Sequence, residues 1–396
     1  MLDDIIGDKR PLTWLLQFWP VPLLSFISAL AATSFCKKIA LKFGIVDKPD
    51  QLVKTHKDSV AYLGGVGILV GLTVGVLTGL YCLYGSDDFR SSFVWLLGIL
   101  GGASIACFVG LVDDIFDLRP RYKFLGQILA AVILIVVGVT PNLHLIARPL
   151  GIPMEADPEM SSASWIVQSS LAAGIVVFFV LGATNSLNLL DGLDGLCAGV
   201  TAIITLAMLL LSIHLATWGY SKSGDPARMI ICLALVGGVC GFLPFNRHPA
   251  KIFMGDAGSM LLGYTAASLM LLFSEGVPRW WMASIVVFGL PILDTGLALV
   301  RRLLNKRPLF VSDRGHIYDQ MIDRGIPLTR TVAICYLLAA GYAMVGLVMS
   351  QMRTWYAAGV YLTVIVVSAV VVWRKGFLKM EGLRGAVRNE STDQTA

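Results

Sequence analysis

The sequence predicts an all-α protein that crosses a membrane about eleven times. Of its 396 residues 56% are hydrophobic and only 14% are charged, and the mean hydropathy is +0.75. A soluble globular domain carries roughly 25% charged residues, so this chain is too poor in charge to cover a water-facing surface. The apolar stretches are continuous over about 20 residues, the length of a membrane helix, and do not alternate as in a β-barrel.

Eleven stretches are long and apolar enough to be membrane helices. They cover residues 20–38, 61–84, 92–112, 123–141, 165–183, 196–218, 229–245, 257–275, 281–300, 331–350 and 354–373. The whole chain, 1–396, is therefore expected to form one integral membrane domain. Residues 1–19 would be an external N-terminal segment, and residues 374–396 a cytosolic tail.

The positions of the basic residues predict the orientation, because cytoplasmic loops of membrane proteins carry an excess of Lys and Arg. If the N-terminus lies outside, the inside segments hold 23 of the 31 Lys and Arg residues. This asymmetry predicts an external N-terminus and a cytosolic C-terminus. The net charge of +5 is explained by the same distribution and gives no reason to expect a nucleic-acid partner.

Acidic residues gather in three of the predicted cytosolic loops, each beside the membrane end of a span. These loops contain Asp113, Asp114 and Asp117; Asn185, Asn188, Asp191 and Asp194; and the segment from Phe245 to Ser259, with Lys251 and Asp256. Isolated acids here could simply be solvated loop residues. Three acidic loops on one face instead indicate a shared site, because crowded carboxylates repel unless a cation lies among them. Mg²⁺ with substrate phosphates is the expected partner.

The spacing within each loop adds to this prediction. If Asp113 and Asp117 share a helix, their i, i+4 spacing places both carboxylates on one face. Asn185, Asn188 and the two aspartates after them recur every three residues, which would form a polar strip along a helical segment. Asp256 follows Gly255 at the start of a span, where a helix N-terminus favours a negative charge.

Two other features have more than one interpretation. Asp294 is the only acid well inside a predicted span, and it could be functional or could pair with Arg301. Gly64 and Gly65 belong to a glycine run without the lysine of a phosphate-binding loop, so close helix packing is the simpler explanation.

These motifs, in this order, resemble those of the polyprenyl-phosphate N-acetylhexosamine-1-phosphate transferases. The resemblance extends from about Asp47 to about Gly325 and involves four separate motifs. It implies that Asp113 and Asp114 are essential, that Asp117, Asp191 and Asp194 are catalytic with them, and that Asp256 is a magnesium ligand with Asn188. It also implies substrate-binding roles, which fall to Asn185, Asn188, His56, Lys251, Arg314 and His316.

The resemblance implies transfer of an N-acetylhexosamine 1-phosphate, most simply N-acetylglucosamine 1-phosphate, from a UDP-sugar to undecaprenyl phosphate with release of UMP. The enzyme would lie in the inner (cytoplasmic) membrane with its site facing the cytosol, use Mg²⁺ and initiate a cell-envelope polysaccharide; a homodimer stays open. The alternative within the family is the phospho-N-acetylmuramoyl-pentapeptide transferase. That branch has a histidine triplet, whereas His316 stands alone in its loop, and eleven spans also favour the polysaccharide branch.

Two alternatives come from other classes. A secondary transporter would place its ionisable groups near the bilayer midplane, whereas here they lie at one membrane face. A CDP-alcohol phosphotransferase also uses clustered aspartates, but its DGxxAR run is missing after Asp191-Gly192.

Overall fold

The computed structural model describes residues 10–47, 60–143, 162–218, 225–306 and 315–378. These ranges are almost entirely helical, which confirms the predicted all-α fold. The helices are α2 (Arg10–Gln17), α3 (Pro20–Phe43), α4 (Gly64–Leu83), α5 (Phe89–Phe116), α6 (Pro120–Val136), α8 (Ser162–Leu190), α9 (Leu196–Thr217), α10 (Asp225–Asn246), α11 (Gly255–Leu272), the 3₁₀ helix η2 (Phe273–Glu275), α12 (Pro278–Val287), α13 (Gly289–Leu304), α14 (Ile317–Asp323), α15 (Leu328–Ser350) and α16 (Thr354–Arg374).

The described residues contain nine helices that are long and apolar enough to cross a membrane, or ten when the pair α12 and α13 counts as one span. The protein is therefore a multi-pass membrane protein. The prediction of one helix over 281–300 is wrong, because α12 and α13 meet at an angle of 69°. Hydropathy did not reveal this break, because the apolar stretch continues past Phe288; Gly289 and Pro291 directly after it are residues that interrupt helices. The described part of the predicted external segment forms the short helix α2.

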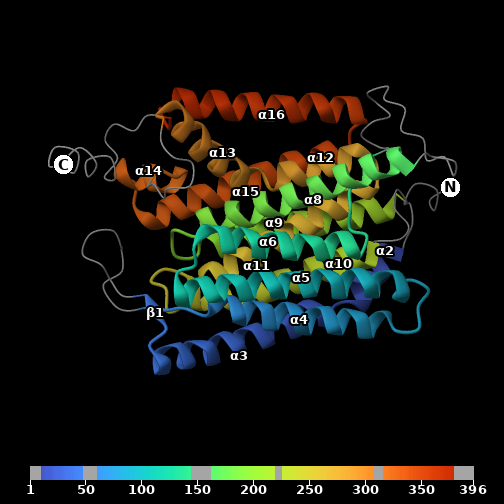
Figure 1. Ribbon diagram of the computed structural model, residues 1–396, viewed down its shortest axis with the longest axis horizontal. Coiled ribbons are helices and arrows are strands. Elements are labelled where there is room, and N and C mark those ends of the chain that lie inside the picture. Colours follow the sequence, from blue (N-terminus) through green and yellow to red (C-terminus); the bar gives the residue numbers. More distant parts are fainter. Residues whose placement is uncertain (1–9, 48–59, 144–161, 219–224, 307–314, 379–396) are drawn as a thin grey trace.

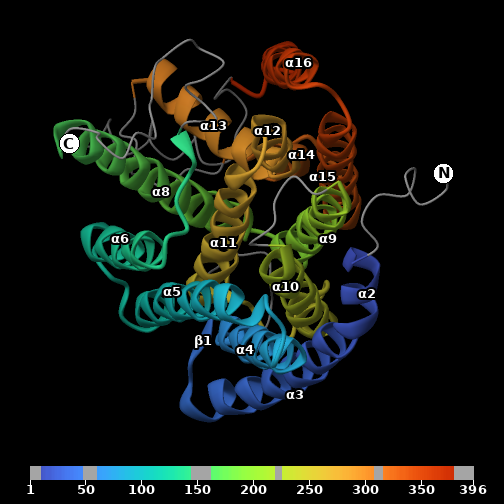
Figure 2. The ribbon, with the colours of Figure 1, turned by 90° about the vertical axis from the view of Figure 1, so that its right-hand side faces the viewer.

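The helices run side by side around α11, which occupies the centre of the bundle (Figure 2). An 18-residue window of the span Gly255–Glu275 is 100% buried, whereas the corresponding window of α16 is 11% buried. α16 lies at the edge of the bundle in both views (Figures 1 and 2). The central helix is thus shielded from lipid by the other helices, and α16 is not.

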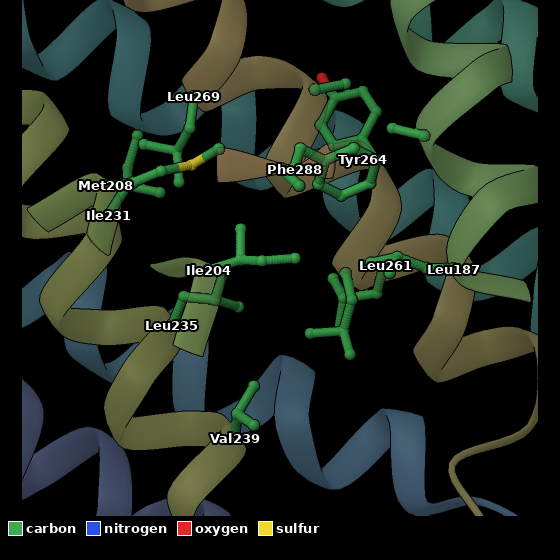
Figure 3. Close-up of a cluster of buried hydrophobic side chains, with 14 of the residues drawn as sticks. Leu187, Ile204, Met208, Ile231, Leu235, Val239, Leu261, Tyr264, Leu269 and Phe288 are labelled. Carbon is green, nitrogen blue, oxygen red and sulfur yellow. The ribbon is translucent and has the colours of Figure 1, made fainter. Parts of the chain in front are cut away.

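The interior of the bundle is apolar (Figure 3). Side chains such as Leu187 of α8, Met208 of α9, Leu235 of α10 and Leu261 of α11 are fully buried there. Helices in lipid gain stability from this kind of close packing. An unpaired charge would be costly in such an interior, so the charged chemistry is expected at the helix ends.

A two-stranded ribbon fastens the connection before α11 to the start of α4. Strand β1 (Val46–Asp47) pairs antiparallel with β2 (Val60–Ala61), and Ala61 also forms a bridge with Ile252. The carbonyl of Ala61 accepts the N–H of Phe253 at 2.8 Å. At the start of α4, the N–H groups of Gly64 and Gly65 donate to the carbonyls of Phe253 and Met254, both at 3.0 Å. Otherwise unpaired amides of α4 therefore hold the segment that leads into α11.

Glycines allow α4 and α5 to approach α11 closely. A Cβ atom on Gly65 would overlap the backbone of Gly258, and one on Gly110 would overlap the carbonyl of Asp256. This confirms that Gly64 and Gly65 serve helix packing. The start of α11 is consequently held between two other helices by backbone contact.

We predict that Gly110→Ala destabilises the protein, because its methyl group meets backbone that cannot rotate away. Overpacking of this kind costs about 1–3 kcal/mol. The matched control is Gly101→Ala on the same helix, where a Cβ would meet nothing within 4 Å. Thermal unfolding in detergent should show a lower midpoint for Gly110→Ala only. Equal midpoints for both variants would contradict the close crossing.

Candidate active site

Four of the predicted acidic residues meet where α5 and α8 end and α11 begins, on the left in Figure 1. We call this group the acidic cluster: Asp113, Asp114, Asp191 and Asp256. Asp113 and Asp114 lie in the last turn of α5, Asp191 directly follows α8, and Asp256 is the second residue of α11. Residues from three separate motifs are therefore brought to one end of the bundle.

Asp114 caps the N-terminus of α11. Its carboxylate accepts the N–H of Asp256 at 2.8 Å and the N–H of Ala257 at 3.1 Å. These amides have no partner within the helix, and a negative charge is favoured at this end of a helix. The sequence had suggested that Asp256 itself would benefit from the helix N-terminus, but the amides bind Asp114. A Cβ on Gly255 would overlap the Asp114 carboxylate, which explains the glycine at that position.

Asp256 is held by two side chains from other helices. Nδ2 of Asn188 on α8 donates to Oδ1 of Asp256 at 2.6 Å and lies 3.0 Å from Oγ of Ser259. Lys123 on α6 forms an ion pair with Oδ2 of Asp256. The Asp256 side chain is 26% exposed, so a ligand arriving from outside the bundle can still reach it.

Lys123 links two carboxylates of the cluster. Its Nζ lies 3.0 Å from Oδ2 of Asp113 and also contacts Asp256. Oδ1 of Asp113 accepts the N–H of Leu118 at 2.9 Å. From the sequence alone, Lys123 is only one of the basic residues that predict the orientation. Its spacing of four residues from Gln127, a polar residue in an apolar stretch, is the signal that could have identified it.

Gln127 is a second residue of the site that was not predicted from the sequence. It is 1% exposed, and its Oε1 accepts from Nδ2 of Asn185 at 3.1 Å. Nδ2 of Asn185 also donates to the carbonyl of Leu181 at 2.7 Å, within α8. The predicted polar strip thus begins on α8 with Asn185 and Asn188. It is not a continuous helix, because α8 ends at Leu190 and only a tight turn carries Asp191 further.

Asp194 binds a neighbouring loop. Its Oδ2 lies 2.7 Å from Nδ1 of His248 and accepts the N–H of Ala250 at 3.1 Å. It therefore holds the connection between α10 and α11. Lys251, in the same connection, has an exposed side chain at this end of the bundle.

Asp117 does not share a helical face with Asp113. The helix α5 ends at Phe116, and Asp117 has a left-handed backbone with φ 50°. Its side chain is exposed. The i, i+4 argument for this pair is therefore wrong, because Asp117 forms the C-cap of α5.

The pKa of Asp191 is affected by the other acidic residues around it. Burial raises its pKa well above the ordinary value for an aspartate, and the charges of Asp256, Asp114 and Asp194 raise it further. A carboxyl group in this position binds a proton more readily than usual unless a cation is present. The acidic cluster as a whole thus favours a positively charged ligand.

The last predicted loop contains His316, which is buried at the start of α14. Its Nδ1 lies 2.7 Å from Oδ2 of Asp294 on α13. Asp294 therefore pairs with His316 and not with Arg301, which donates to the carbonyl of Gly315. His56 and Arg314, the remaining predicted substrate-binding residues, lie outside the described residues.

The residues of the site fit Mg²⁺ by their donor chemistry. Mg²⁺ is bound in proteins by one or two carboxylates together with substrate phosphates and waters. Among the residues that the structure describes, Lys123 pairs with two carboxylates of the acidic cluster, those of Asp113 and Asp256. Among the described residues there is no preformed group of three acidic, His or Cys ligands. Asn188 presents its NH₂ group to Asp256, so its predicted role as a ligand requires the amide to turn.

Comparison with known proteins gives consistent results. Residues 96–274 match the description "Glycosyl transferase family 4". The chain is 30% identical over 375 residues, 92% of each chain, to the probable undecaprenyl-phosphate N-acetylglucosaminyl 1-phosphate transferase of Bacillus subtilis. It is 30% identical over 346 residues to the decaprenyl-phosphate N-acetylglucosaminephosphotransferase of Mycolicibacterium smegmatis, covering 80% of this chain and 78% of the relative. It is 26% identical over 319 residues, 79% and 78%, to the undecaprenyl-phosphate alpha-N-acetylglucosaminyl 1-phosphate transferase of Escherichia coli K12.

We predict that Mg²⁺ raises the thermal unfolding midpoint of the purified protein in detergent, because it binds the folded acidic cluster. A ligand at 100 times its Kd stabilises the folded state by about 2.7 kcal/mol. Asp256→Asn should lose most of this shift. Asp87→Asn, an exposed residue between α4 and α5, is the control and should keep it. An equal shift in all three proteins would contradict a cation site at Asp256.

Proposed function

The chain belongs to glycosyl transferase family 4, and we propose that it transfers N-acetylglucosamine 1-phosphate from UDP-N-acetylglucosamine to undecaprenyl phosphate. UMP is the second product. The names of these relatives support this choice of donor and the polyprenyl-phosphate class of acceptor. The lipid product would start the synthesis of a cell-envelope polysaccharide.

The observation that carries the proposal is the assembly of the acidic cluster around Lys123 at one end of a membrane bundle. A polyprenyl phosphate keeps its chain in the bilayer and its phosphate at the surface. A nucleotide sugar is soluble and arrives from the water. A charged site at the membrane surface is accessible to both substrates, whereas a site at the midplane is not.

We assign this end of the bundle to the cytosol, with the N-terminus outside and eleven spans. The eleventh span is α6, whose 17 residues are just short of a typical membrane helix. The excess of basic residues in the connections at this end supports the orientation. Gln320 of α14 donates to the carbonyl of Phe377 at 2.8 Å, so the residues after α16 lie at the same end. The membrane would be the inner (cytoplasmic) membrane. That the protein forms a homodimer remains a prediction.

In the proposed reaction, an oxygen of the lipid phosphate attacks the phosphorus that carries the sugar. The bond between this phosphorus and the oxygen shared with the uridine-bearing phosphorus breaks, and UMP leaves. One pyrophosphate bond is thus formed as another is broken. Side chains contribute mainly by positioning the two phosphates and by neutralising charge.

Each residue has a distinct proposed role. Asp256 and Asn188 would hold Mg²⁺, which supplies positive charge next to the diphosphate when it is bound. Asp114 positions Asp256 through the start of α11, and Asp113 keeps Lys123 beside it. Asp191 and Asp194 are the other catalytic residues of the proposal, and the contact between Asp194 and His248 fixes the loop that carries Lys251. Asp117 is still proposed to be catalytic, as an exposed residue beside the acidic cluster. His56, Asn185, Lys251, Arg314 and His316 would contact the substrates.

The alternatives receive less support. The three relatives cited above are named for N-acetylglucosaminyl or N-acetylglucosamine phosphate transfer, not for a pentapeptide substrate. A transporter would need its ionisable groups near the midplane of the membrane. Asp294 lies deepest in a predicted span, but it contacts His316, one of the proposed substrate-binding residues.

The test of the function is incubation of the purified protein with undecaprenyl phosphate, Mg²⁺ and one nucleotide at a time. We expect release of UMP with UDP-N-acetylglucosamine, and little or none with UDP-N-acetylmuramoyl-pentapeptide or a CDP-alcohol. Turnover of the pentapeptide nucleotide without turnover of UDP-N-acetylglucosamine would assign the chain to the other branch of the family.

We predict that Asp256→Asn lowers turnover by at least about 100-fold, a barrier increase of about 2.7 kcal/mol, because the shape remains but the negative charge is lost. Glu275→Gln is the matched control, since it removes a carboxylate at the opposite end of the same apolar span. Its turnover should be close to that of the wild type. An Asp256→Asn protein with normal turnover and unchanged dependence on Mg²⁺ would reject the metal role.

We predict that cysteines at the two ends of the bundle react from opposite sides of the membrane. In intact cells, an impermeant maleimide should label Asp87→Cys and should label Lys375→Cys only after permeabilisation. Both positions are exposed, and the unmodified protein gives the background of the seven natural cysteines. Labelling of Lys375→Cys, but not of Asp87→Cys, in intact cells would reverse the orientation and exclude the cytosolic site.

A further inference from the structure

Asp294 is a fully buried acid whose carboxylate binds two consecutive residues at the start of α14. Oδ2 lies 2.7 Å from Nδ1 of His316, and Oδ1 accepts the N–H of Ile317 at 2.7 Å. Ile317 is the first residue of α14, so one carboxylate fixes both the imidazole ring and the helix that follows it. An ionised carboxylate can only accept hydrogen bonds, so Nδ1 of His316 carries the proton in this contact.

The His316 ring is also held in place by Tyr318. Its ring stacks on the His316 ring, with centroids 5.6 Å apart and an interplanar angle of 12°. Its hydroxyl donates to the carbonyl of Leu189 at 2.9 Å, two residues before Asp191. A Cβ on Gly192 would overlap this hydroxyl group, so the tyrosine lies directly against the turn that carries Asp191. The His316 ring is therefore fixed in position relative to the acidic cluster.

The break between α12 and α13 brings Asp294 to this place. α13 leaves α12 at 69°, and Asp294 lies in its second turn. The next residue, Thr295, donates to Oγ of Ser186 on α8 at 2.8 Å. The bent helix is thus attached to α8, the helix that carries Asn185 and Asn188, at the level of Asp294.

We infer that Asp294 is a positioning residue for the transfer reaction: it fixes the tautomer and orientation of His316 so that Nε2 is directed at a phosphate of the UDP-sugar. This inference rests on the proposed function. Asp294 itself does not contact the substrate. A histidine whose Nδ1 donates to a carboxylate has a defined tautomer and contacts other groups through Nε2. If Asp294 only stabilised the fold, its loss would have the same effect on kcat/KM whether or not His316 is present.

The inference is tested by a double-mutant cycle on kcat/KM for UDP-N-acetylglucosamine. Asp294→Asn should lower kcat/KM by at least about tenfold, because the amide no longer enforces one tautomer of the ring. In a His316→Ala background the same change should cost less than about threefold, because the group that it positions is absent. Losses that multiply independently would overturn the inference. Glu275→Gln serves as the control for removing a carboxylate far from the site.

A second pair of variants keeps the test decisive if Asp294→Asn does not fold. In His316→Asn the amide nitrogen can take the place of Nδ1, so the contact with Asp294 and the melting temperature should be retained. No group replaces Nε2, so kcat/KM should fall as far as in His316→Ala. Normal kcat/KM for a stable His316→Asn protein would overturn the inference. Absence of UMP release by the wild type would instead contradict the proposed function.

Discussion

Asp114 accepts the backbone N–H groups of Asp256 and Ala257, and the geometry of the site follows from this contact. It joins the end of α5 to the start of α11, the helix at the centre of the bundle. The same short segment is held from the other side by the amides of Gly64 and Gly65 at the start of α4. Asp256 is consequently fixed by backbone contacts on two sides, while its own carboxylate remains available to Lys123 and Asn188.

The site also reflects the cost of placing charge next to lipid. Carboxylates are expensive inside a bilayer and far less so at its surface, and the acidic cluster lies at the helix ends. Within it, Lys123 contacts two of the four acids, and the pKa of Asp191 is raised by burial and by its neighbours. In the proposed function these acids bind Mg²⁺, whose charge offsets that of the substrate phosphates. Asp294, well inside a predicted span, avoids the penalty by its hydrogen bonds to His316 and Ile317.

Much of this could be predicted from the sequence, because a membrane imposes simple rules. Long apolar stretches predicted the helical bundle, and acids beside their ends predicted the residues that meet in the acidic cluster. The break at Phe288 was not predicted because only hydropathy was considered, whereas Gly289 and Pro291 directly after it are residues that interrupt helices. Lys123 and Gln127 were missed because a single basic residue at a helix end, or a single amide within a helix, has many ordinary explanations. The prediction for Asp117 failed because hydropathy does not show the residue at which a helix ends. The partner of Asp294 was missed because His316 is 22 residues away, directly before α14.

The central claim is that the site moves a phosphate together with the sugar, and the position of the phosphorus reports this directly. UDP-N-acetylglucosamine labelled with ³²P in the phosphate next to the sugar is incubated with the protein, undecaprenyl phosphate and Mg²⁺, and the lipid phase is extracted. The account predicts that the label enters the lipid while unlabelled UMP stays in the water. Label that remains in the water as UDP, with the sugar alone in the lipid, would contradict it.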